Sequence, residues 1–294
     1  MVRITKAIIA AAGFGTRFLP ATKVIPKEML PLIDKPIIQY LVEEAAASGI
    51  REVILVTRPG VSTIKDHFGQ HVTLEKHLLK QEKKEMLCSL KKIGRLAKVT
   101  LIQQDPQLPY GTGAPLVTVE KMIKKGEYFI FILGDDLFKA QEPAAKQLLK
   151  IWQKDKKAVI LGCGQIKRQE SQKWGVVKLK KGSKNEVEMM VEKPKPSEAP
   201  STLGSFGRYV LNKEIIDILL KQKKQLPKGR EFYLTDAIDT YCRKNKVVVA
   251  KIRGKFFTTG DPLNWLKATV EYALARPDLG KEFSQYLKKL TKAL

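Results

Sequence analysis

Residues 11–20 read AAGFGTRFLP and residues 26–31 read PKEMLP, directly after the short apolar run AIIA at residues 7–10. The apolar run predicts a buried strand that ends in a loop with two glycines. Because glycine has no Cβ, backbone N–H groups in such a loop can approach a phosphate closely, and Arg17 and Lys27 add positive charge beside it. The sequence therefore predicts a nucleoside-triphosphate site at the end of the first strand of an α/β sheet.

Two familiar phosphate-binding loops do not fit these residues. The dinucleotide pattern G-x-G-x-x-G needs a third glycine where this chain has Phe18, and Pro20 and Pro26 prevent a helix from starting directly after the loop. The Walker pattern needs Gly-Lys-Ser or Gly-Lys-Thr, whereas Gly15 is followed by Thr-Arg. The loop is therefore a phosphate-binding loop of a different kind.

Composition and cysteine usage predict a cytoplasmic globular protein. The apolar content of 44% is ordinary for that class. No apolar run approaches the ~18 residues needed to cross a membrane, so we expect no membrane partner. The three cysteines, Cys88, Cys163 and Cys242, lie far apart without metal-ligand spacing, which predicts reduced thiols.

The net charge is unusual, because 54 Lys and Arg residues face 30 Asp and Glu residues, a formal balance of +24. This excess makes a nucleic-acid binder the rival hypothesis. However, the lysines are scattered along predicted helices, and no basic tract is interleaved with the aromatic residues that single-strand binders use for stacking. We interpret them as solvated helix faces that also attract polyanionic substrates, and expect no specific nucleic-acid partner.

Apolar runs alternate with helical patterns along the chain, which predicts stacked βαβ units. We expect an α/β fold with a Rossmann-like, mixed and mainly parallel sheet flanked by helices, and a smaller mixed or antiparallel part. The expected strands of the main sheet lie at residues 7–11, 53–57, 99–103, 128–133 and 157–162. A single domain is expected over 1–294, with a nucleotide-binding half at about 1–165, a second half at about 166–260 and C-terminal helices at about 261–294.

The helical segments follow from capping residues and charge. Helices are expected at residues 36–48 and 115–124, and residues 62–93 have the pattern of a charged, mostly helical surface excursion. Near the C-terminus, Asp261 is expected to cap a helix with proline at its first position, and Asp278 to cap the last helix.

A pair of carboxylates follows the apolar strand at residues 128–133. Open α/β sheets bind ligands at the carboxyl ends of their parallel strands, where the first loop and Asp135 would both lie. Mg²⁺ is typically bound by one or two protein carboxylates together with substrate phosphates. The sequence therefore predicts a Mg²⁺–nucleotide site at this edge of the sheet.

The run from Gly13 to Pro31 resembles the opening of bacterial UTP:glucose-1-phosphate uridylyltransferases (UDP-glucose pyrophosphorylases), within the sugar nucleotidyltransferase family. The resemblance continues in the family's order to Asp239, through residues 134–136, 174–177, 192–194, 199–203, 207–211 and 234–239. It implies the nucleotide-diphospho-sugar transferase type of fold. It also implies in-line attack of glucose 1-phosphate on the α-phosphate of UTP, assisted by Mg²⁺, to give UDP-glucose and pyrophosphate.

The resemblance also implies roles for individual residues. Arg17 and Lys27 would take the triphosphate, and Lys193 the sugar 1-phosphate together with the nucleotide phosphates. Asp135 would bind the metal, with Asp136 acting behind it or through water. Glu192 would meet the sugar hydroxyls, and Gly175 would allow close backbone approach to the sugar ring in the second, sugar-binding half. The implied nucleotide-binding set is Ala11, Ala12, Gly13, Gly15, Thr16, Gln104, Gly111 and Gly113.

Two places depart from the family's pattern. Ala114 and Pro115 stand where relatives carry His-Ala in the base loop. The register of the Gln that reads the base is ambiguous, and we choose Gln104. Thr258 stands where relatives carry an Asp that completes the metal site in the broader family. Asp261 is either its replacement or a helix cap, and we favour the cap.

These departures leave alternatives open. One is a related nucleotidyltransferase that uses dTTP or another sugar 1-phosphate. Another is a non-catalytic UDP-sugar-binding paralogue, which Thr258 and Ala114 suggest. A homo-oligomer, either dimer or tetramer, is expected, with the final helices and residues 62–93 as natural contact regions.

Overall fold

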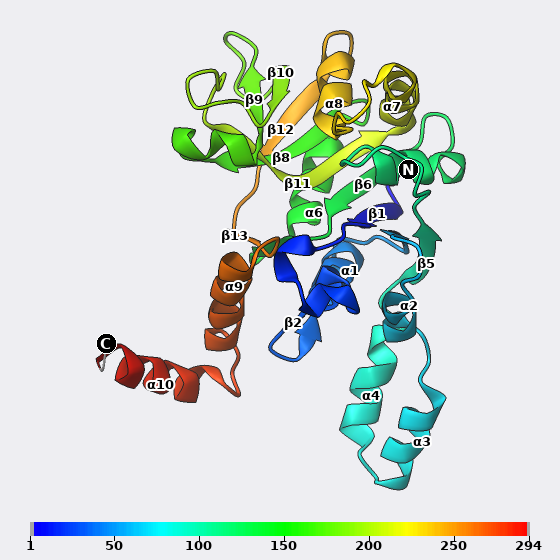
Figure 1. Cartoon of the computed structure of the whole chain (residues 1–294), viewed down its shortest axis with the longest axis vertical. Coiled ribbons are helices and arrows are strands. Elements are labelled where there is room, and N and C mark those ends of the chain that lie inside the picture. The colour runs from blue at the N-terminus through cyan, green and yellow to red at the C-terminus, as the bar shows by residue number, and fades with distance from the viewer. Residues whose placement is uncertain (1–2, 293–294) are drawn as a thin grey trace.

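The computed structural model describes residues 3–292, and within them the main sheet is mixed and nine-stranded (Figure 1). Seven strands follow the order β10-β9-β11-β6-β1-β4-β5, and β8 pairs with both β11 and β12. The strands are β1 (Lys6–Ala11), β4 (Glu52–Thr57), β5 (Lys98–Gln103), β6 (Tyr128–Leu133), β8 (Val159–Gln165), β9 (Gly175–Leu179), β10 (Val187–Glu192), β11 (Leu203–Asn212) and β12 (Val247–Lys251).

The first half of the sheet is parallel, as predicted. β1 pairs in parallel with β6 on one side and β4 on the other, and β4 pairs in parallel with β5. Strand β1 is buried on both faces: Ile8 packs with one hydrophobic cluster and Ile9 with the other, because successive side chains of a strand point to opposite faces. The carboxyl ends of β1 and β6 therefore meet at one edge.

Helices cover both faces of the sheet. α1 (Ile37–Ala47) and α6 (Ala144–Trp152) belong to the cluster with Ile9, while α5 (Ala114–Thr118), α7 (Lys213–Gln225) and α8 (Leu234–Cys242) belong to the cluster with Ile8. The predicted helix over residues 115–124 is shorter than expected, because α5 ends at Thr118 and the 3-10 turn η4 (Glu120–Met122) follows.

The second half of the sheet is mixed and antiparallel, as expected, and it continues the first half through β11. This strand pairs antiparallel with β6, β8 and β9. The sequence analysis did not predict it, because Gly204, Ser205 and Gly207 interrupt its apolar pattern. The register with β8 shifts between Ser205 and Tyr209, and Gly207 there has a φ of +58°. The division of the chain near residue 165 stays a prediction.

Two short antiparallel ribbons lie outside the main sheet. β2 (Pro31–Leu32) pairs with β3 (Lys35–Pro36), and β7 (Asp136–Lys139) pairs with β13 (Lys255–Thr258). The second ribbon sets Thr258 opposite Asp136, which brings the C-terminal part of the chain to the end of β6.

Two helical arms extend from the body in Figure 1. One contains α2 (Thr63–Phe68), α3 (Val72–Lys80) and α4 (Lys84–Ile93) and is the predicted charged excursion; the other contains α9 (Pro262–Leu274) and α10 (Gly280–Lys292). The Asp261 carboxylate caps α9 as predicted, accepting a hydrogen bond from the Asn264 N–H. Asp278 differs from its prediction: α10 begins two residues later, and the Asp278 carboxylate pairs with Arg276 at 2.6 Å. Among residues 3–292, no helix is both long and apolar enough to cross a bilayer.

Candidate active site

A cleft of about 620 Å³ lies at the carboxyl ends of β1 and β6 and extends to β9 and β10. Most of the predicted site residues line it: Ala12, Gly13, Arg17, Lys27, Gln104, Gly111, Asp135, Gly175, Glu192 and Lys193. Among the described residues, the lining does not include Ala11, Gly15, Thr16 or Gly113. The fold therefore gathers side chains from the whole length of the chain at one sheet edge.

The loop after β1 winds through three 3-10 turns, η1 (Thr16–Phe18), η2 (Ala21–Lys23) and η3 (Lys27–Met29). Gly15 has a φ of +64°, and a Cβ there would lie 3.1 Å from Thr22 Cγ2 and 3.2 Å from Lys27 Cβ. Gly15 thus lets the loop fold back tightly enough for Lys27 to reach the cleft. Arg17 is exposed and points its guanidinium toward the Gly260 carbonyl, 3.4 Å away.

Lys27 and Asp135 form the central ion pair of the cleft, with Nζ 2.5 Å from Oδ2. Burial would lower the pKa of Lys27, but the carboxylates of Asp135 and Glu28 outweigh burial and raise it above its ordinary value. Burial would likewise raise the pKa of Asp135, but Lys27 holds it below its usual range. Both groups therefore stay charged.

Two neighbouring carboxyls behave differently. Burial and the adjacent charge of Asp135 raise the pKa of Asp136 to about 8. Burial raises the pKa of Glu28 to about 7, and its Oε2 has no hydrogen-bond partner among the described residues. The sequence analysis missed Glu28, although it stands inside the quoted PKEMLP run. These groups leave Asp135 as the carboxylate that is firmly ionised at the end of β6.

The side chains around Asp135 suit a cation that takes most of its ligands from water and substrate and only one from the protein. Asp135 is part-exposed to the cleft, whereas Asp261 is occupied: its oxygens accept hydrogen bonds from the backbone and side chain of Asn264 at 3.0 and 2.7 Å. Thr258 offers a hydroxyl rather than a carboxylate. Within residues 3–292, no three His, Cys, Asp or Glu side chains are grouped to hold a metal by themselves.

One side of the cleft is built by Gln104 and residues 110–113. Gln104 lines the cleft and its buried Oε1 has no partner among the described residues, whereas the Gln103 side chain is not part of the lining. Gly111 has a φ of +142°, and a Cβ there would lie 2.6 Å from the Phe232 nitrogen. Gly113 lies behind the wall, donating its N–H to the Phe232 carbonyl at 2.9 Å.

The opposite side is formed by the paired strands β9 and β10, whose register sets Gly175 opposite Glu192. A Cβ on Gly175 would lie 2.6 Å from Met190 Cε and 2.9 Å from Thr235 Cγ2, so the close packing here needs glycine. Lys193 follows β10 with a φ of +46° and donates its N–H to the Trp174 carbonyl at 2.9 Å. Burial raises the pKa of Glu192.

Glu231 and Tyr233, which the sequence analysis missed, contact Lys193. The ammonium of Lys193 lies 3.4 Å from Glu231 Oε2 and 4.8 Å from the centre of the Tyr233 ring. Burial would lower the pKa of Lys193, but Glu231 and Glu192 outweigh it and raise that pKa above its ordinary value. The sequence signal that could have revealed them is a charged residue followed by two aromatic residues, at positions 231–233.

The chain matches the model of a family described as nucleotidyl transferase over residues 6–274. It is 40% identical over 292 residues to a UTP–glucose-1-phosphate uridylyltransferase of Staphylococcus epidermidis, covering 99% of both chains. It is similar to the solved structure of a UTP-bound UGPase from Acinetobacter baumannii, with a TM-score of 0.87, 30% identity and coverage of 98% of this chain and 100% of that one. A UDP-glucose pyrophosphorylase complexed with UDP-glucose gives a TM-score of 0.80 at 33% identity, covering 93% and 100%.

Proposed function

The chain belongs to the nucleotidyl transferase family, and we propose that it makes UDP-glucose and pyrophosphate from UTP and glucose 1-phosphate. The relatives named for this reaction cover nearly the whole chain. The observation that carries the proposal is the cleft itself, because its lining holds Arg17, Lys27, Asp135 and Lys193 together between a base side and a second side rich in hydrogen-bonding groups.

The reaction needs positioned charge more than acid–base chemistry. An oxygen of the glucose 1-phosphate forms a bond to the α-phosphorus of UTP, and the bond from that phosphorus to the bridging oxygen of pyrophosphate breaks. The attacking oxygen is already ionised at neutral pH, so no general base is required. Catalysis then rests on holding two polyanions in line and stabilising the charge that develops.

The positions of the side chains in the cleft support the following roles. Arg17 and Lys27 lie beside the loop after β1 and bind the triphosphate, while Lys193 on the opposite side binds the attacking phosphate. Glu192 accepts hydrogen bonds from sugar hydroxyls, and the backbone of Gly175, which lines the cleft, lies close to the ring. In the loop after β1, Ala12 and Gly13 line the cleft and present backbone groups to the nucleotide, while Ala11, Gly15 and Thr16 lie outside the lining and shape the loop.

The metal of this proposal is Mg²⁺, held by Asp135. When bound, Mg²⁺ neutralises phosphate oxygens and orients them for displacement. Asp135 would supply one protein carboxylate, and water and substrate phosphates would supply the remaining ligands, as Mg²⁺ commonly accepts. Asp136 lies behind Asp135, and Thr258 leaves the position across the ribbon without a carboxylate.

Gln104 and the backbone of Gly111 read the base. The unpaired Oε1 of Gln104 is an acceptor that suits the N3–H of uracil, while Gly113 fixes the loop from behind. Thymine has the same N3–H, so the 5-methyl group must be excluded by shape.

Pyrophosphate release with UTP, dTTP, CTP and ATP, each with several sugar 1-phosphates, tests the substrate preference. We expect UTP and glucose 1-phosphate to give the highest kcat/KM. Preference for another pair would support the related-enzyme alternative.

The second candidate is a UDP-sugar-binding protein without turnover, which the absence of a carboxylate at Thr258 favours. Binding of UDP-glucose by calorimetry, measured alongside Mg²⁺-dependent pyrophosphate release, separates the two. Binding without release would identify the non-catalytic protein.

We also propose a homo-oligomer, a dimer or tetramer, that covers the outer face of the C-terminal helices. Leu263, Leu266 and Leu274 of α9 are spaced along one side of that helix and are exposed, as are Tyr286 and Leu290 of α10. Light scattering should give a dimer or tetramer that Leu266→Glu dissociates; a monomeric wild type would contradict this.

The three cysteines are free thiols, which is compatible with the cytoplasmic location that we propose.

A further inference from the structure

The ammonium of Lys193 lies within a small cage. Glu231 Oε2 is 3.4 Å away, Glu192 Oε1 is 3.7 Å away, and the Tyr233 ring lies beneath it. The Tyr233 hydroxyl donates a hydrogen bond to the same Glu231 oxygen at 2.7 Å. Glu231 is therefore itself held in place while it contacts the ammonium.

Lys193 needs such support because of its backbone and its stem. Its φ of +46° lies in the left-handed region, which a non-glycine residue keeps only where its surroundings enforce it. A lysine side chain has four flexible methylene groups, so its charge is poorly placed unless it is held. A φ in this region sets the direction of the side chain, and the cage sets the place of its charge.

The segment that carries Glu231 is joined to the base loop. The Phe232 N–H donates to the Tyr110 carbonyl at 2.7 Å, and the Leu234 N–H donates to Thr112 Oγ1 at 2.9 Å. Phe232 is 1% exposed, so the segment is anchored by burial as well. The residue that holds Lys193 thus lies on a segment that also shapes the wall beside Gly111.

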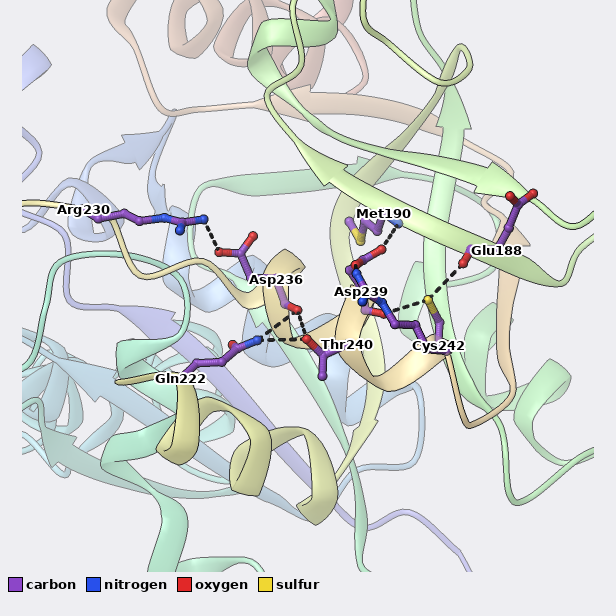
Figure 2. Close-up of polar contacts among 9 residues, drawn as sticks. Glu188, Met190, Gln222, Arg230, Asp236, Asp239, Thr240 and Cys242 are labelled. Atoms are coloured by element: carbon purple, nitrogen blue, oxygen red, sulfur yellow. Dashed lines mark hydrogen bonds and ion pairs between the residues drawn. The ribbon is translucent and has the colours of Figure 1, made fainter. Parts of the chain in front are cut away.

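Figure 2 shows the polar contacts that join α8 to strand β10 and to α7. The Asp239 carboxylate of α8 accepts a hydrogen bond from the Met190 N–H of β10 at 3.1 Å, and Cys242 Sγ donates to the Glu188 carbonyl at 3.3 Å. Gln222 of α7 donates to the Asp236 carbonyl at 3.1 Å. Strand β10, which leads to Lys193, is therefore tied to the helix that begins just after Glu231.

We propose that Glu231 is a positioning residue for nucleotidyl transfer, which holds the Lys193 ammonium where the attacking phosphate binds. This inference rests on the proposed function. Two carboxylates around one ammonium give the cage a net negative charge before phosphate binds. Removing the charge of Glu231 therefore does not weaken phosphate binding, but it releases the ammonium from its place. The expected signature is a lower kcat without a higher KM for glucose 1-phosphate.

The test compares Glu231→Gln, Lys193→Met and the double variant in full-length enzyme, with kcat and both KM values. We expect Glu231→Gln to lower kcat about 10-fold with KM for glucose 1-phosphate equal to or below that of the wild type. In the Lys193→Met background, the same change should alter kcat by less than about 2-fold, because residues that act through one another are not additive.

Matched variants separate positioning from structure. Glu188→Gln makes the same change in an exposed pair with Lys178, 2.9 Å apart on the strands that lead to the cleft, and should leave kcat unchanged. Tyr233→Phe keeps the ring but not the hydroxyl, and should lower kcat by about 3-fold with KM unchanged; it replaces Glu231→Gln if that variant does not fold.

An unchanged kcat in Glu231→Gln, or an equal loss with and without Lys193, would overturn the positioning role alone. A wild-type enzyme without pyrophosphate release would overturn the proposed function, and the positioning role with it.

Discussion

Lys27 Nζ lies 2.5 Å from Asp135 Oδ2, although 108 residues separate them in the sequence. The cation assigned to the triphosphate and the carboxylate assigned to the metal therefore neutralise each other in this structure. In the proposed reaction, Asp135 would hold the metal and Lys27 would bind phosphate, so both groups would give up this contact when the substrate binds. The pair keeps both charges fixed in advance at the place where they are needed.

Asp135→Asn should abolish the metal dependence of the reaction. The neutral amide is a poor Mg²⁺ ligand and also leaves Lys27 without its partner, so we expect kcat/KM to fall by roughly 100- to 1000-fold or more. Mn²⁺ binding in the presence of UTP, measured by electron paramagnetic resonance, should weaken in parallel. Unaltered Mn²⁺ affinity would remove Asp135 from the metal site.

Arg17→Ala should lower kcat/KM for UTP by roughly 100- to 1000-fold, or ~3–4 kcal/mol, because a preorganised cation at the triphosphate is lost. The fold should be unaffected, since Arg17 is exposed and its one hydrogen bond to Gly260, at 3.4 Å, is long. Thermal unfolding and kinetics together check this. Retention of most of the turnover would exclude Arg17 from the mechanism.

Arg208→Met should destabilise the fold strongly. The Arg208 side chain is 0% exposed, and its guanidinium binds both carboxylate oxygens of Glu44 at 2.9 and 2.8 Å and the Asp136 carbonyl at 2.7 Å. Breaking a buried pair leaves a buried charge, which costs about 3–5 kcal/mol. Denaturant unfolding of Arg208→Met, compared with Arg276→Met at an exposed pair with Asp34, measures the difference. Equal losses would contradict it.

Glu28→Gln should stabilise the protein in a pH-dependent way. The pKa of Glu28 is raised to about 7 from an ordinary 4.5, so between these values the folded state holds more protons than the unfolded state. Stability therefore falls as pH rises through this window, and the ionised carboxyl costs up to about 3 kcal/mol above it. Glutamine removes this cost.

The measurement for Glu28→Gln is the Tm at two pH values. Its Tm should exceed that of the wild type at pH 8, and the difference should shrink toward pH 5. A difference that is the same at both values would show that the carboxyl of Glu28 does not titrate in this range.

The parallel half of the fold could be predicted because its signals are local. Apolar runs mark β1, β4, β5 and β6, and the glycines and basic residues of the first loop stand in one short stretch. The place of Asp135 followed from a general rule, that parallel strands end at one edge. Which of Gln103 and Gln104 faces the cleft needed the structure, because the side chains of adjacent residues at a strand end point to different sides.

The rest depended on pairings between distant segments. The β7–β13 ribbon joins residues with no periodic pattern, and it alone sets Thr258 opposite Asp136. The contact between Lys193 and Glu231 spans a separation of 38 residues and arises from the packing of α8 on β10. Asp278 followed a capping rule that is sound in general, but a nearby arginine took its carboxylate instead.

Strand β11 has a mechanical consequence. It is hydrogen-bonded to β6 of the parallel half of the sheet and to β8 and β9 of the second half, so the two rims of the cleft are built on one continuous sheet. A relative movement of the two rims would therefore have to deform this continuous hydrogen-bonded ladder.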